Sequence, residues 1–415
     1  MNKMDRRRTG TDCDLIIIGA GMVGATLALA CGQAGMRVVI VDGQVPAADL
    51  QDEYDLRVSA ITLASREIFR NLGIWQDLVQ RRVCPLREMY VWDARGSGAI
   101  HFDAAELGEA QLGYIIENRA IIHAAHTHIA RLPVVSLMCP ATLAAVDVRE
   151  AGVTAMLSDG TALTAQLVVG ADGAESRVRK LAGIDSRSGS YDQIAIVANV
   201  RTSAPHGEIA RQVFLATGPL AFLPLCDPNL SSIVWSCESR YGKSLLGLED
   251  NAFRQELQAS FGDRLGEIGE VSARAAFPLG FAHAQHYVDA RVALVGDAAH
   301  RVHPLAGQGA NLGLLDAATL AEVIGSAFRL DRDIGTFGVL RRFERWRKGG
   351  NLMMLTVTDS IKRAFGTDYW PIRAARNFAL TATDVLVPVK RLVMRRAVGL
   401  EGDLPPLAKR IPFGD

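Results

Sequence analysis

Short apolar runs and helical patterns alternate along the first part of the chain. Residues 14–18 (DLIII) form an apolar run that ends at Gly19, which is typical of a parallel strand buried on both faces. Residues 22–35 carry Ala and Leu at helical spacing, and residues 37–41 (RVVIV) form a second apolar run that ends at Asp42. The three segments predict a strand–helix–strand unit.

The middle of the chain contains both helical and strand-like patterns. We expect helices over residues 59–80 and 114–131, where apolar residues recur at helical spacing. Ser158-Asp159-Gly160 predicts a hairpin turn, and residues 161–169 (TALTAQLVV) then form a strand that runs into Gly170. Strands and helices in alternation favour an α/β fold.

The second half of the chain begins with a region rich in strands. Between about 190 and 275, short β-rich segments alternate with turns, with one helix near 250–262. Residues 291–296 (RVALVG) return to a buried strand, residues 310–327 predict an apolar helix, and residues 340–398 are helical and rich in arginine. This order predicts a sheet inserted into an α/β domain, followed by C-terminal helices.

Composition and charge narrow the class of protein. The 415 residues include 45 Lys plus Arg and 45 Asp plus Glu, and the resulting zero net charge disfavours nucleic acid as the main partner. No run approaches the ~20 apolar residues that span a bilayer. The basic N-terminus resembles the start of a secretory signal, but the apolar stretch after it is interrupted by glycines and predicts a strand and a turn. Six scattered cysteines without a CxxC pair fit reduced thiols in a cytoplasm.

The first motif is Gly19-Ala-Gly21-Met-Val-Gly24, between the first strand and its helix. Gly19 suits a tight turn, Gly21 lets a pyrophosphate approach the backbone, and Gly24 lets the helix pack closely on the strand. Asp42, at the end of the second strand, is placed to accept hydrogen bonds from ribose hydroxyls. The motif predicts a bound dinucleotide but does not separate FAD from NAD.

The second motif, over residues 295–313 (VGDAAHRVHPLAGQGANLG), follows another buried strand. Asp297, after Gly296, is placed to accept hydrogen bonds from a polyol such as ribitol. The loop that follows is rich in small residues and lets the backbone lie against a flat ring, and the next helix aims its N–H groups at developing negative charge. We therefore predict a flavin site that includes Pro304, Gly307, Gln308, Gly309, Ala310 and Asn311.

The third motif contains Asp172, Gly173, Ser176 and Arg179, again directly after a buried strand. In their order and spacing, the three motifs resemble those of the FAD-dependent aromatic hydroxylases, the class A flavoprotein monooxygenases. The resemblance covers nearly the whole chain. It implies a Rossmann-like FAD-binding domain and a role for Asp172 and Gly173 at the cofactor.

Further segments resemble the ubiquinone-biosynthesis hydroxylases within that class. They are His303–Asp316, Leu56–Ile61, Ile116–Arg119, Arg211–Phe214, Ala221–Leu225 and Ala397–Leu400. The resemblance places Arg57 and Arg119 near the flavin and its phosphates, although Arg119 read alone could equally be a surface ion-pair partner. Asp42 stands where many such flavoproteins carry Glu, and the shorter acid can still reach a ribose.

The resemblance implies a reaction. FAD is reduced by NAD(P)H, O2 adds to give a C4a-hydroperoxyflavin, and oxygen passes to the ring of a polyprenyl phenol or quinol. The segments 75–77, 91–93, 211–214 and 233–235 most resemble the bacterial 2-polyprenylphenol hydroxylase branch, which acts at ring carbon 5. Residues 102–107 instead resemble the branch that hydroxylates the methylated, methoxylated quinol.

Two other functions stay open from the sequence. One is a hydroxylase or epoxidase of another apolar aromatic compound, and the other is a non-enzymatic carrier of prenyl lipids. The flavin loop weighs against a carrier, because a carrier has no need of it.

The resemblance also implies a division into domains. The FAD-binding domain comprises residues 1–84, 107–185 and 280–345. The substrate domain comprises residues 85–106 and 186–279. Residues 346–415 form a C-terminal helical segment.

The histidines have several interpretations. His123, His126 and His128 are close in sequence, but no cysteine or carboxylate joins them locally, and we expect no metal site. His303 lies in the flavin loop, where it could contact substrate or a proton path as a catalytic residue, or simply shape the loop.

A polyprenyl substrate resides in a membrane, and the C-terminal segment offers one route to it. Apolar residues between Leu386 and Met394 lie among Lys390, Arg391, Arg395 and Arg396, as in a helix that rests on an anionic membrane. A helix that caps the FAD domain with a solvated basic face is an equal alternative, and so is association with other enzymes of the pathway. We expect a cytoplasmic protein, either free or peripheral on the inner face of the cell membrane.

Overall fold

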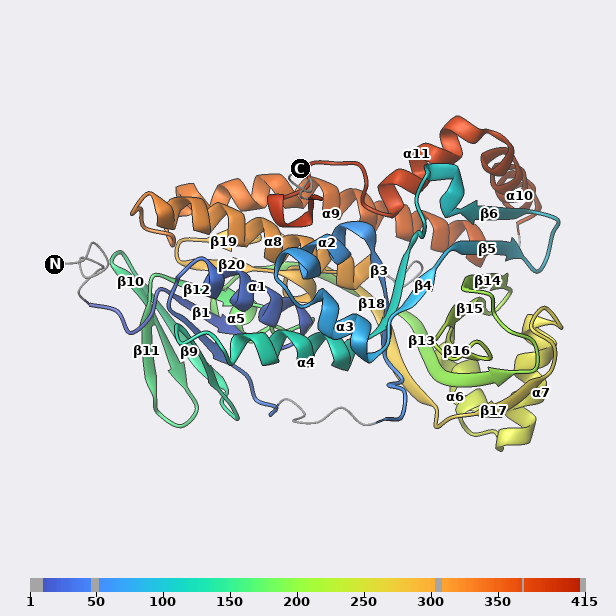
Figure 1. Cartoon of the computed structure of the whole chain (residues 1–415), viewed down its shortest axis with the longest axis horizontal. Helices are drawn as coiled ribbons and strands as arrows, with labels where there is room; N and C mark the ends of the chain where they lie inside the picture. The colour runs from blue at the N-terminus through green and yellow to red at the C-terminus, as the bar shows by residue number, and fades with distance from the viewer. Residues whose placement is uncertain (1–9, 46–51, 303–307, 368, 411–415) are drawn as a thin grey trace.

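A parallel sheet lies at the centre of the larger of two domains in the computed structural model, which describes residues 10–45, 52–302, 308–367 and 369–410 (Figure 1). Its strands, in spatial order, are β19 (Val288–Asp289), β20 (Val292–Leu294), β12 (Leu167–Gly170), β1 (Leu15–Ile18), β2 (Val38–Val41) and β8 (Val135–Met138). Neighbouring strands are parallel except β19 and β20. All four residues of β1 are buried, which explains the unbroken apolar run in the sequence.

Helices cover this sheet. They are α1 (Met22–Gln33), α4 (Asn118–Ile129), α8 (Gln308–Arg329) and α9 (Phe337–Gly366). Helix α1 packs against both α4 and α8, and α8 packs against α9. A separate antiparallel sheet joins β9 (Leu143–Arg149), β10 (Gly152–Leu157) and β11 (Ala162–Ala165), and α5 (Arg177–Leu181) packs against β9. Strands β11 and β12 divide the single strand expected over 161–169.

For the helices predicted over 59–80 and 114–131, the prediction is wrong for the first residues of each segment. Both segments begin as strands, β3 (Val58–Thr62) and β7 (Gly113–Glu117), which pair with each other in a small antiparallel sheet with β4 (Cys84–Leu86). Helices α2 (Leu63–Asn71) and α3 (Trp75–Arg81) follow β3, and α4 follows β7. The strands are rich in β-branched and aromatic residues, whose fit to a pleated surface prevails over the helical spacing.

The second domain is a large, mostly antiparallel sheet, here called the substrate sheet. Its strands are β5 (Glu88–Asp93), β6 (Ala99–Asp103), β13 (Ser186–Thr202), β14 (Ile209–Leu215), β15 (Gly218–Pro224), β16 (Leu230–Glu238), β17 (Ile268–Val271), β18 (Ala275–Ala284) and β21 (His300–Arg301). Helices α6 (Ser239–Leu246) and α7 (Asp250–Phe261) cover one face around a core that includes Trp235, Phe222 and Phe253. The domain boundary predicted at 279–280 lies inside β18, which reaches back toward the FAD domain and pairs with β21.

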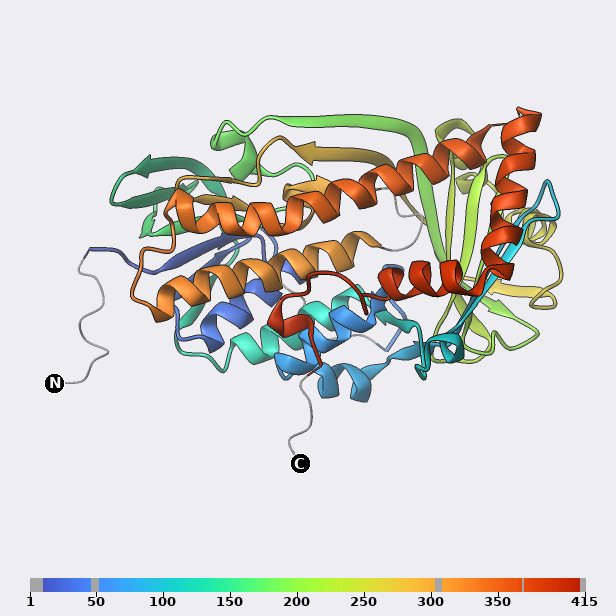
Figure 2. The same cartoon turned by 90° about the horizontal axis from the view of Figure 1, so that it is seen from above.

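The C-terminal helices connect the two domains. Helix α9 runs along α8 and extends to the substrate sheet, where α10 (Trp370–Val385) packs against β6 (Figure 2). Helix α11 (Val387–Ala397) then contacts the 3-10 turn over Ala104–Leu107. Among the described residues, no helix combines the length and apolarity that a membrane span requires. The predicted α/β fold with a sheet domain and C-terminal helices is confirmed.

Candidate functional site

The glycine turn between β1 and α1 has the geometry that the first motif predicts. Gly19 has φ +108°, and a Cβ there would lie 2.4 Å from the carbonyl oxygen of Ala171. A Cβ on Gly24 would lie 1.9 Å from the carbonyl oxygen of Gly19, so both positions exclude a side chain. A Cβ on Gly21 would meet no atom within 4 Å. Gly21 therefore faces open space at the start of the helix.

The N-terminus of α1 has the donors that a phosphate needs. No side chain caps it, and no acidic residue lies in its first turn, both within the described part of the chain. The free N–H groups and the positive end of the helix dipole therefore favour an anion in front of Gly21.

Asp42 lies beside this turn. Its Oδ2 accepts a hydrogen bond from the N–H of Ala20 (2.6 Å), and its Oδ1 accepts one from the N–H of Gln44 (2.8 Å). From the other side, His126 Nε2 lies 2.8 Å from the carbonyl oxygen of Ala20. Sequence reasoning gave His126 no role at the turn, because only the packing of α4 on α1 brings it there. The contact of Asp42 with a ribose stays a prediction.

The third motif is held by its own hydrogen bonds. The carboxylate of Asp172 accepts from Ser176 Oγ (2.5 Å) and from the N–H of Arg177 (2.6 Å), and so it caps α5. Gly173 has φ +77°, in the left-handed region that favours glycine. The buried Arg179 donates to the carbonyl oxygen of Ala298 (2.8 Å), which joins this motif to the Gly296-Asp297 motif.

Asp297 has an unusual environment. Its side chain is exposed, yet surrounding protein raises the pKa of its carboxyl by burial, an effect that the charges of His300, Arg301 and Arg57 partly offset. A carboxylate that is open to solvent but set deep in the fold lies in a recess. This is the environment expected of a group that accepts hydrogen bonds from a bound polyol.

A buried polar network lies directly behind this recess, here called the Asp316 network. Asp316 accepts from the N–H of Gly296 (3.1 Å), from His300 Nε2 (2.5 Å), from Arg347 Nε (2.8 Å) and from Asn351 Nδ2 (3.1 Å). Burial alone would raise the pKa of the Asp316 carboxyl, but the charges of His300 and Arg347 and their hydrogen bonds hold it well below its usual range. Asp316 ends the segment that carries the family resemblance, but the sequence does not indicate its partners.

The start of α8 lies next to β3. Asn311 Oδ1 accepts from the N–H of Thr62 (2.9 Å), and its Nδ2 donates to the carbonyl oxygen of Ala60 (2.8 Å). Gly309 and Ala310 are half-buried in the first turn of the helix, which begins at Gln308. The predicted residues His303, Pro304 and Gly307 lie outside the described residues. The binding roles of this segment stay predictions.

The two predicted arginines occupy different positions. Arg57 is exposed after Asp55, with its guanidinium carbon 5.2 Å from the ring centre of Phe277, and its charge lowers the pKa of Asp297. Arg119 Nη2 lies 3.1 Å from Oε2 of the buried Glu117, so an ion pair positions it at the start of α4. These contacts do not test the predicted flavin contacts of either arginine.

The substrate sheet presents its second face to the FAD domain. Asn199 Nδ2, in β13, lies 3.4 Å from the carbonyl oxygens of Tyr54 and Asp55. In β14, Val213 belongs to the core under α6 and α7, and the alternation of side chains turns Gln212 and Phe214 to the opposite face. This face and the recess at Asp297 lie on the two sides of the boundary between the domains.

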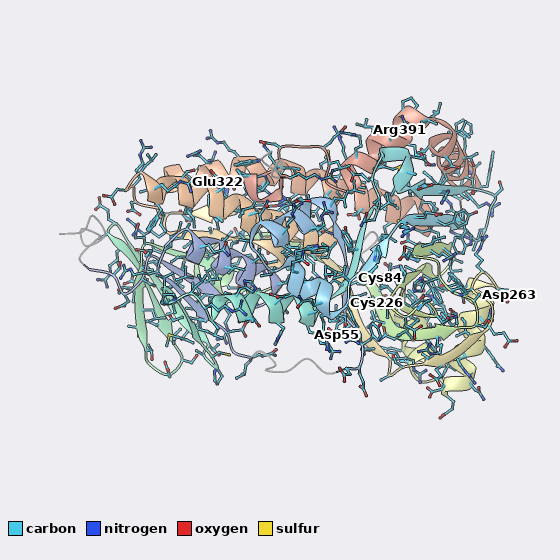
Figure 3. The ribbon with its side chains drawn as sticks, viewed as in Figure 1. Asp55, Cys84, Cys226, Asp263, Glu322 and Arg391 are labelled. Carbon is cyan, nitrogen blue, oxygen red and sulfur yellow. The ribbon has the colours of Figure 1, made fainter. Side chains whose placement is uncertain are left out.

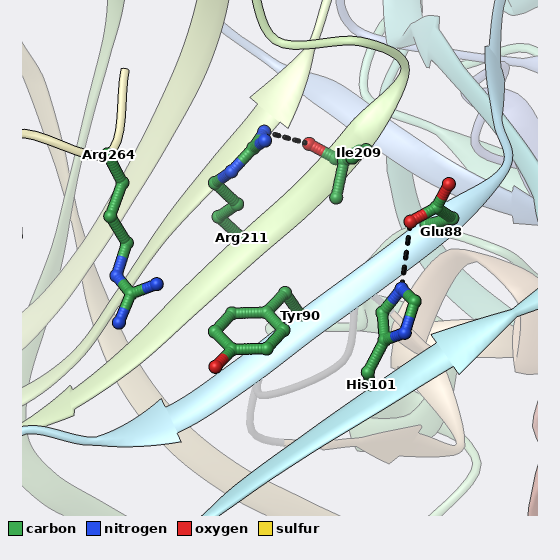
Figure 4. A pocket seen from close by; sticks show the side chains of 6 residues that line it. All are labelled: Glu88, Tyr90, His101, Ile209, Arg211 and Arg264. Atoms are coloured by element: carbon green, nitrogen blue, oxygen red, sulfur yellow. Dashed lines mark hydrogen bonds and ion pairs between the residues drawn. The ribbon is translucent and has the colours of Figure 1, made fainter. Parts of the chain in front are cut away.

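A polar hollow of about 370 Å³ lies elsewhere (Figure 4). It is lined by Glu88, Tyr90, His101, Ile209, Arg211 and Arg264. Arg264 lies over the rings of Tyr90 (5.1 Å) and Trp92 (4.3 Å), and Trp92 packs on Phe261 of α7. The hollow therefore belongs to the face of the sheet that carries α7 and is separate from the recess at Asp297.

The close histidines of α4 have separate partners. His126 contacts the glycine turn, and His128 Nε2 lies 2.5 Å from Asp77 Oδ2. No group of three metal-ligating side chains occurs among the residues that the structure describes.

The donor set fits FAD. Gly21 and the uncapped end of α1 suit a pyrophosphate, and the carboxylates of Asp42 and Asp297 are groups that can accept hydrogen bonds from ribose and ribitol hydroxyls. Bound FAD, reduced by NAD(P)H, supplies the chemistry that activates O2 for hydroxylation.

Comparisons with known proteins agree with this geometry. Residues 12–333 match the family described as FAD binding domain. The chain is 42% identical to "Ubiquinone hydroxylase UbiL" of Rhodospirillum rubrum, over 96% of this chain and 93% of that protein. It is 35% identical to the "3-demethoxyubiquinol 3-hydroxylase" of Escherichia coli, over 94% of this chain and all of that protein. It is 32% identical to human "Ubiquinone biosynthesis monooxygenase COQ6, mitochondrial", over 93% and 92% of the two chains.

Solved structures show the same fold. The p-nitrophenol 4-monooxygenase PnpA from Pseudomonas putida has a TM-score of 0.76 at 20% identity, with 93% of this chain and 98% of that chain covered. PqsL of P. aeruginosa has a TM-score of 0.75 at 24% identity, with coverages of 88% and 99%. The sequence relatives favour an enzyme over the prenyl-lipid carrier. The chain therefore belongs to the FAD-dependent monooxygenases of ubiquinone biosynthesis, which are ring hydroxylases that use O2 and typically NAD(P)H.

Proposed function

We propose that the chain hydroxylates ring carbon 5 of a 2-polyprenylphenol in ubiquinone biosynthesis. The observation that carries the pathway is the 42% identity to a ubiquinone hydroxylase over almost the full length of both chains. The ring position rests on four segments that resemble the 2-polyprenylphenol hydroxylase branch, and three of these lie in strands β5, β14 and β16 of the substrate sheet.

The second face of this sheet supplies a suitable wall for an aromatic ring. Val197, Leu223 and Val234 alternate along neighbouring strands with residues of the core under α6 and α7, so they belong to this face. An apolar wall opposite the flavin excludes water from the reacting atoms. Gln212, which is buried on the same face, offers an amide that can hold a ring hydroxyl.

A second candidate is the later hydroxylation of the methylated, methoxylated polyprenyl benzoquinol. It is favoured by the E. coli relative, whose name states a 3-demethoxyubiquinol 3-hydroxylase. Residues 102–107, which resemble that branch, lie at the end of β6 and in the adjoining 3-10 turn.

Mass spectrometry of quinone intermediates separates the two candidates. Cells without this gene should accumulate a polyprenylphenol with no added ring oxygen if carbon 5 is the target. Accumulation of a methylated, methoxylated quinol that lacks one hydroxyl would instead support the second candidate.

A deletion strain with an unchanged ubiquinone pool would not test the proposal, because a redundant enzyme would also leave the pool unchanged. An assay with purified protein avoids this problem. The FAD-loaded enzyme with NAD(P)H and O2 should add one oxygen atom to a 2-polyprenylphenol presented in detergent. The proposal would be contradicted if the enzyme hydroxylated neither the 2-polyprenylphenol nor the methylated, methoxylated quinol. Asp297→Ala is the matched inactive control, because it removes the expected ribitol acceptor and should lose FAD while the fold remains.

A further inference from the structure

The side of α10 that packs against the substrate sheet combines polar contacts with the half-buried Leu380, which packs on the cluster of Val91, Ile100 and Phe214. Arg376 Nε lies 2.8 Å from Asp93 Oδ2 in β5, and the two side chains are 3% and 0% exposed. Asn377 Nδ2 donates to the same carboxylate oxygen (3.2 Å), and Asn377 Oδ1 accepts from the N–H of Gly98 (2.7 Å). Ionic and hydrogen-bonded contacts thus fasten the helix to the protein.

The opposite side of α10 is apolar and open to solvent. Trp370 is 69% exposed, Phe378 is 76% exposed and Val385 is 71% exposed. Their spacing of eight and seven residues places all three on one side of the helix. An ordinary surface helix exposes a polar side, whereas the exposed side of α10 carries these large apolar side chains.

Helix α11 also exposes apolar residues, although it buries Met394. Lys390 is buried, and its Nζ lies 2.7 Å from Glu106 and 3.0 Å from Asp384. Val389, Leu392 and Val393 are exposed. We define the C-terminal apolar surface by Trp370, Phe378, Val385, Val389, Leu392 and Val393. Exposed apolar residues in such number mark an interaction site.

The exposed charges on these two helices are basic, although Arg395 pairs with Glu401 just beyond α11 (2.6 Å). Residues 369–397 contain six basic residues and one acidic residue, Asp384, which pairs with the buried Lys390. Arg373, Arg391, Arg395 and Arg396 are exposed. Figure 3 shows Arg391 on α11 at the periphery of the molecule. A partner that covers the surface must therefore combine an apolar interior with negative charge.

We propose that the C-terminal apolar surface docks on an anionic lipid bilayer. Trp370 and Phe378 enter the interface between headgroups and acyl chains, and the arginines contact lipid phosphates. A second copy of the chain fits less well, because the arginines of two identical surfaces would repel each other. The proposal goes beyond the reaction itself, since it states which surface of the enzyme contacts a membrane.

Vesicle binding tests the apolar part of the surface. The full-length, FAD-loaded protein should co-sediment with mixed phosphatidylcholine–phosphatidylglycerol vesicles. In the double variant Phe378→Ser, Val385→Ser, two large apolar side chains no longer insert. Its affinity for the vesicles should therefore fall by about tenfold or more. Leu330→Ser is the matched control, since Leu330 is 65% exposed after α8, far from the surface in sequence. Equal binding of all three proteins would overturn the proposal.

Charge variants test the arginines. Arg391→Gln and Arg396→Gln should each weaken binding about fivefold at low salt, and binding to pure phosphatidylcholine should be weak for every variant. Arg345→Gln, an exposed arginine of α9, should change little. The FAD content and melting temperature of each variant report whether it folds.

Tryptophan fluorescence locates the contact. Addition of anionic vesicles should shift the emission to shorter wavelength, and Trp370→Phe should abolish the shift. Light scattering without lipid tests a second copy as the occupant. The proposal would be overturned in favour of self-association by two results together: the unmodified protein is a dimer that does not bind vesicles, and the Phe378→Ser, Val385→Ser variant is a monomer.

Discussion

Two buried arginine–aspartate pairs fasten the C-terminal helices to the rest of the molecule, in opposite surroundings. Arg347 of α9 pairs with Asp316 of α8 (2.8 Å), directly behind the backbone of Gly296. Arg376 of α10 pairs with Asp93 of β5 (2.8 Å), beneath the C-terminal apolar surface. The first pair lies inside the polar network behind Gly296, whereas the second holds a helix that exposes Trp370, Phe378 and Val385.

The comparison shows that a buried ion pair can serve different purposes. Such pairs add little net stability over apolar packing, because both charges must lose their water. Their geometry, however, fixes one arrangement of the elements that they join. The Arg347 pair fixes the segment that holds Asp297, and the Arg376 pair fixes which side of α10 faces out.

Removal of Arg347 should have the largest effect on stability. Arg347→Met leaves the fully buried Asp316 without one of its two basic partners, and such a loss costs about 3–5 kcal/mol. FAD content should fall as well, because Gly296 donates to the same carboxylate. Thermal unfolding and the flavin absorbance of the purified protein measure both effects. Arg345→Met, on the exposed side of α9, is the control.

Removal of Arg376 should cost less and act locally. Arg376→Met also removes donors to the carbonyl oxygens of Ala364 (3.0 Å) and Thr367 (3.1 Å) at the end of α9. We expect a loss of about 2 kcal/mol that is confined to α10 and its neighbours, because this helix lies at the edge of the molecule. Hydrogen exchange should show faster exchange in α10 with little change in α1.

FAD content separates the two arginine variants. Arg376→Met should keep the cofactor, and Arg347→Met should lose much of it. If Arg376→Met lost FAD to the same extent, the two pairs would not have separate purposes.

The sequence predicts one of these regions far better than the other. The β1–α1–β2 unit was predictable because its signals are local: an apolar run, glycines at required positions and an acid at the strand end. The roles of Asp316 and Arg376 were not, since each depends on contacts across the fold. Asp93 and Arg376 are separated by 283 positions, and their pairing, together with the contacts of Asn377, holds the side of α10 that faces the sheet.

Near the site, local sequence patterns gave wrong or incomplete predictions wherever the structure depends on contacts between distant segments. The helical spacing over 59–80 conceals β3, whose partner β7 lies some fifty residues later. Likewise, His126 reaches the glycine turn only through the packing of α4 on α1. Glycine positions, by contrast, were informative because the absence of a Cβ has a direct steric meaning, as at Gly24.

Acid should weaken the Asp316 network selectively. The pKa of Asp316 is held below its unfolded value, so its ionised form contributes stability above that value, and the contribution is lost as the pH falls. From about pH 5 to about pH 3, the advantage of the unmodified protein over Asp316→Asn should shrink, by at most about 1.4 kcal/mol per pH unit. Urea unfolding at several pH values measures it. A constant difference would contradict the assigned ionisation.

The smallest expected effect on stability is at Asp297, and its sign is the opposite. Burial raises the pKa of this carboxyl, so its ionised form is disfavoured at neutral pH in the FAD-free protein. Asp297→Asn should therefore raise the melting temperature of the FAD-free protein by about 1–2 °C, and this gain should vanish as the pH falls and Asp297 takes up a proton. The same substitution should weaken FAD binding about tenfold or more, because a charge-assisted hydrogen bond to the cofactor is lost. Melting curves with and without added FAD measure both effects, with Asp403→Asn as the exposed control. If Asp297→Asn raises the melting temperature without FAD and lowers it with FAD, then Asp297 serves the cofactor and costs the fold stability. If it lowers the melting temperature in both cases, Asp297 has a structural role.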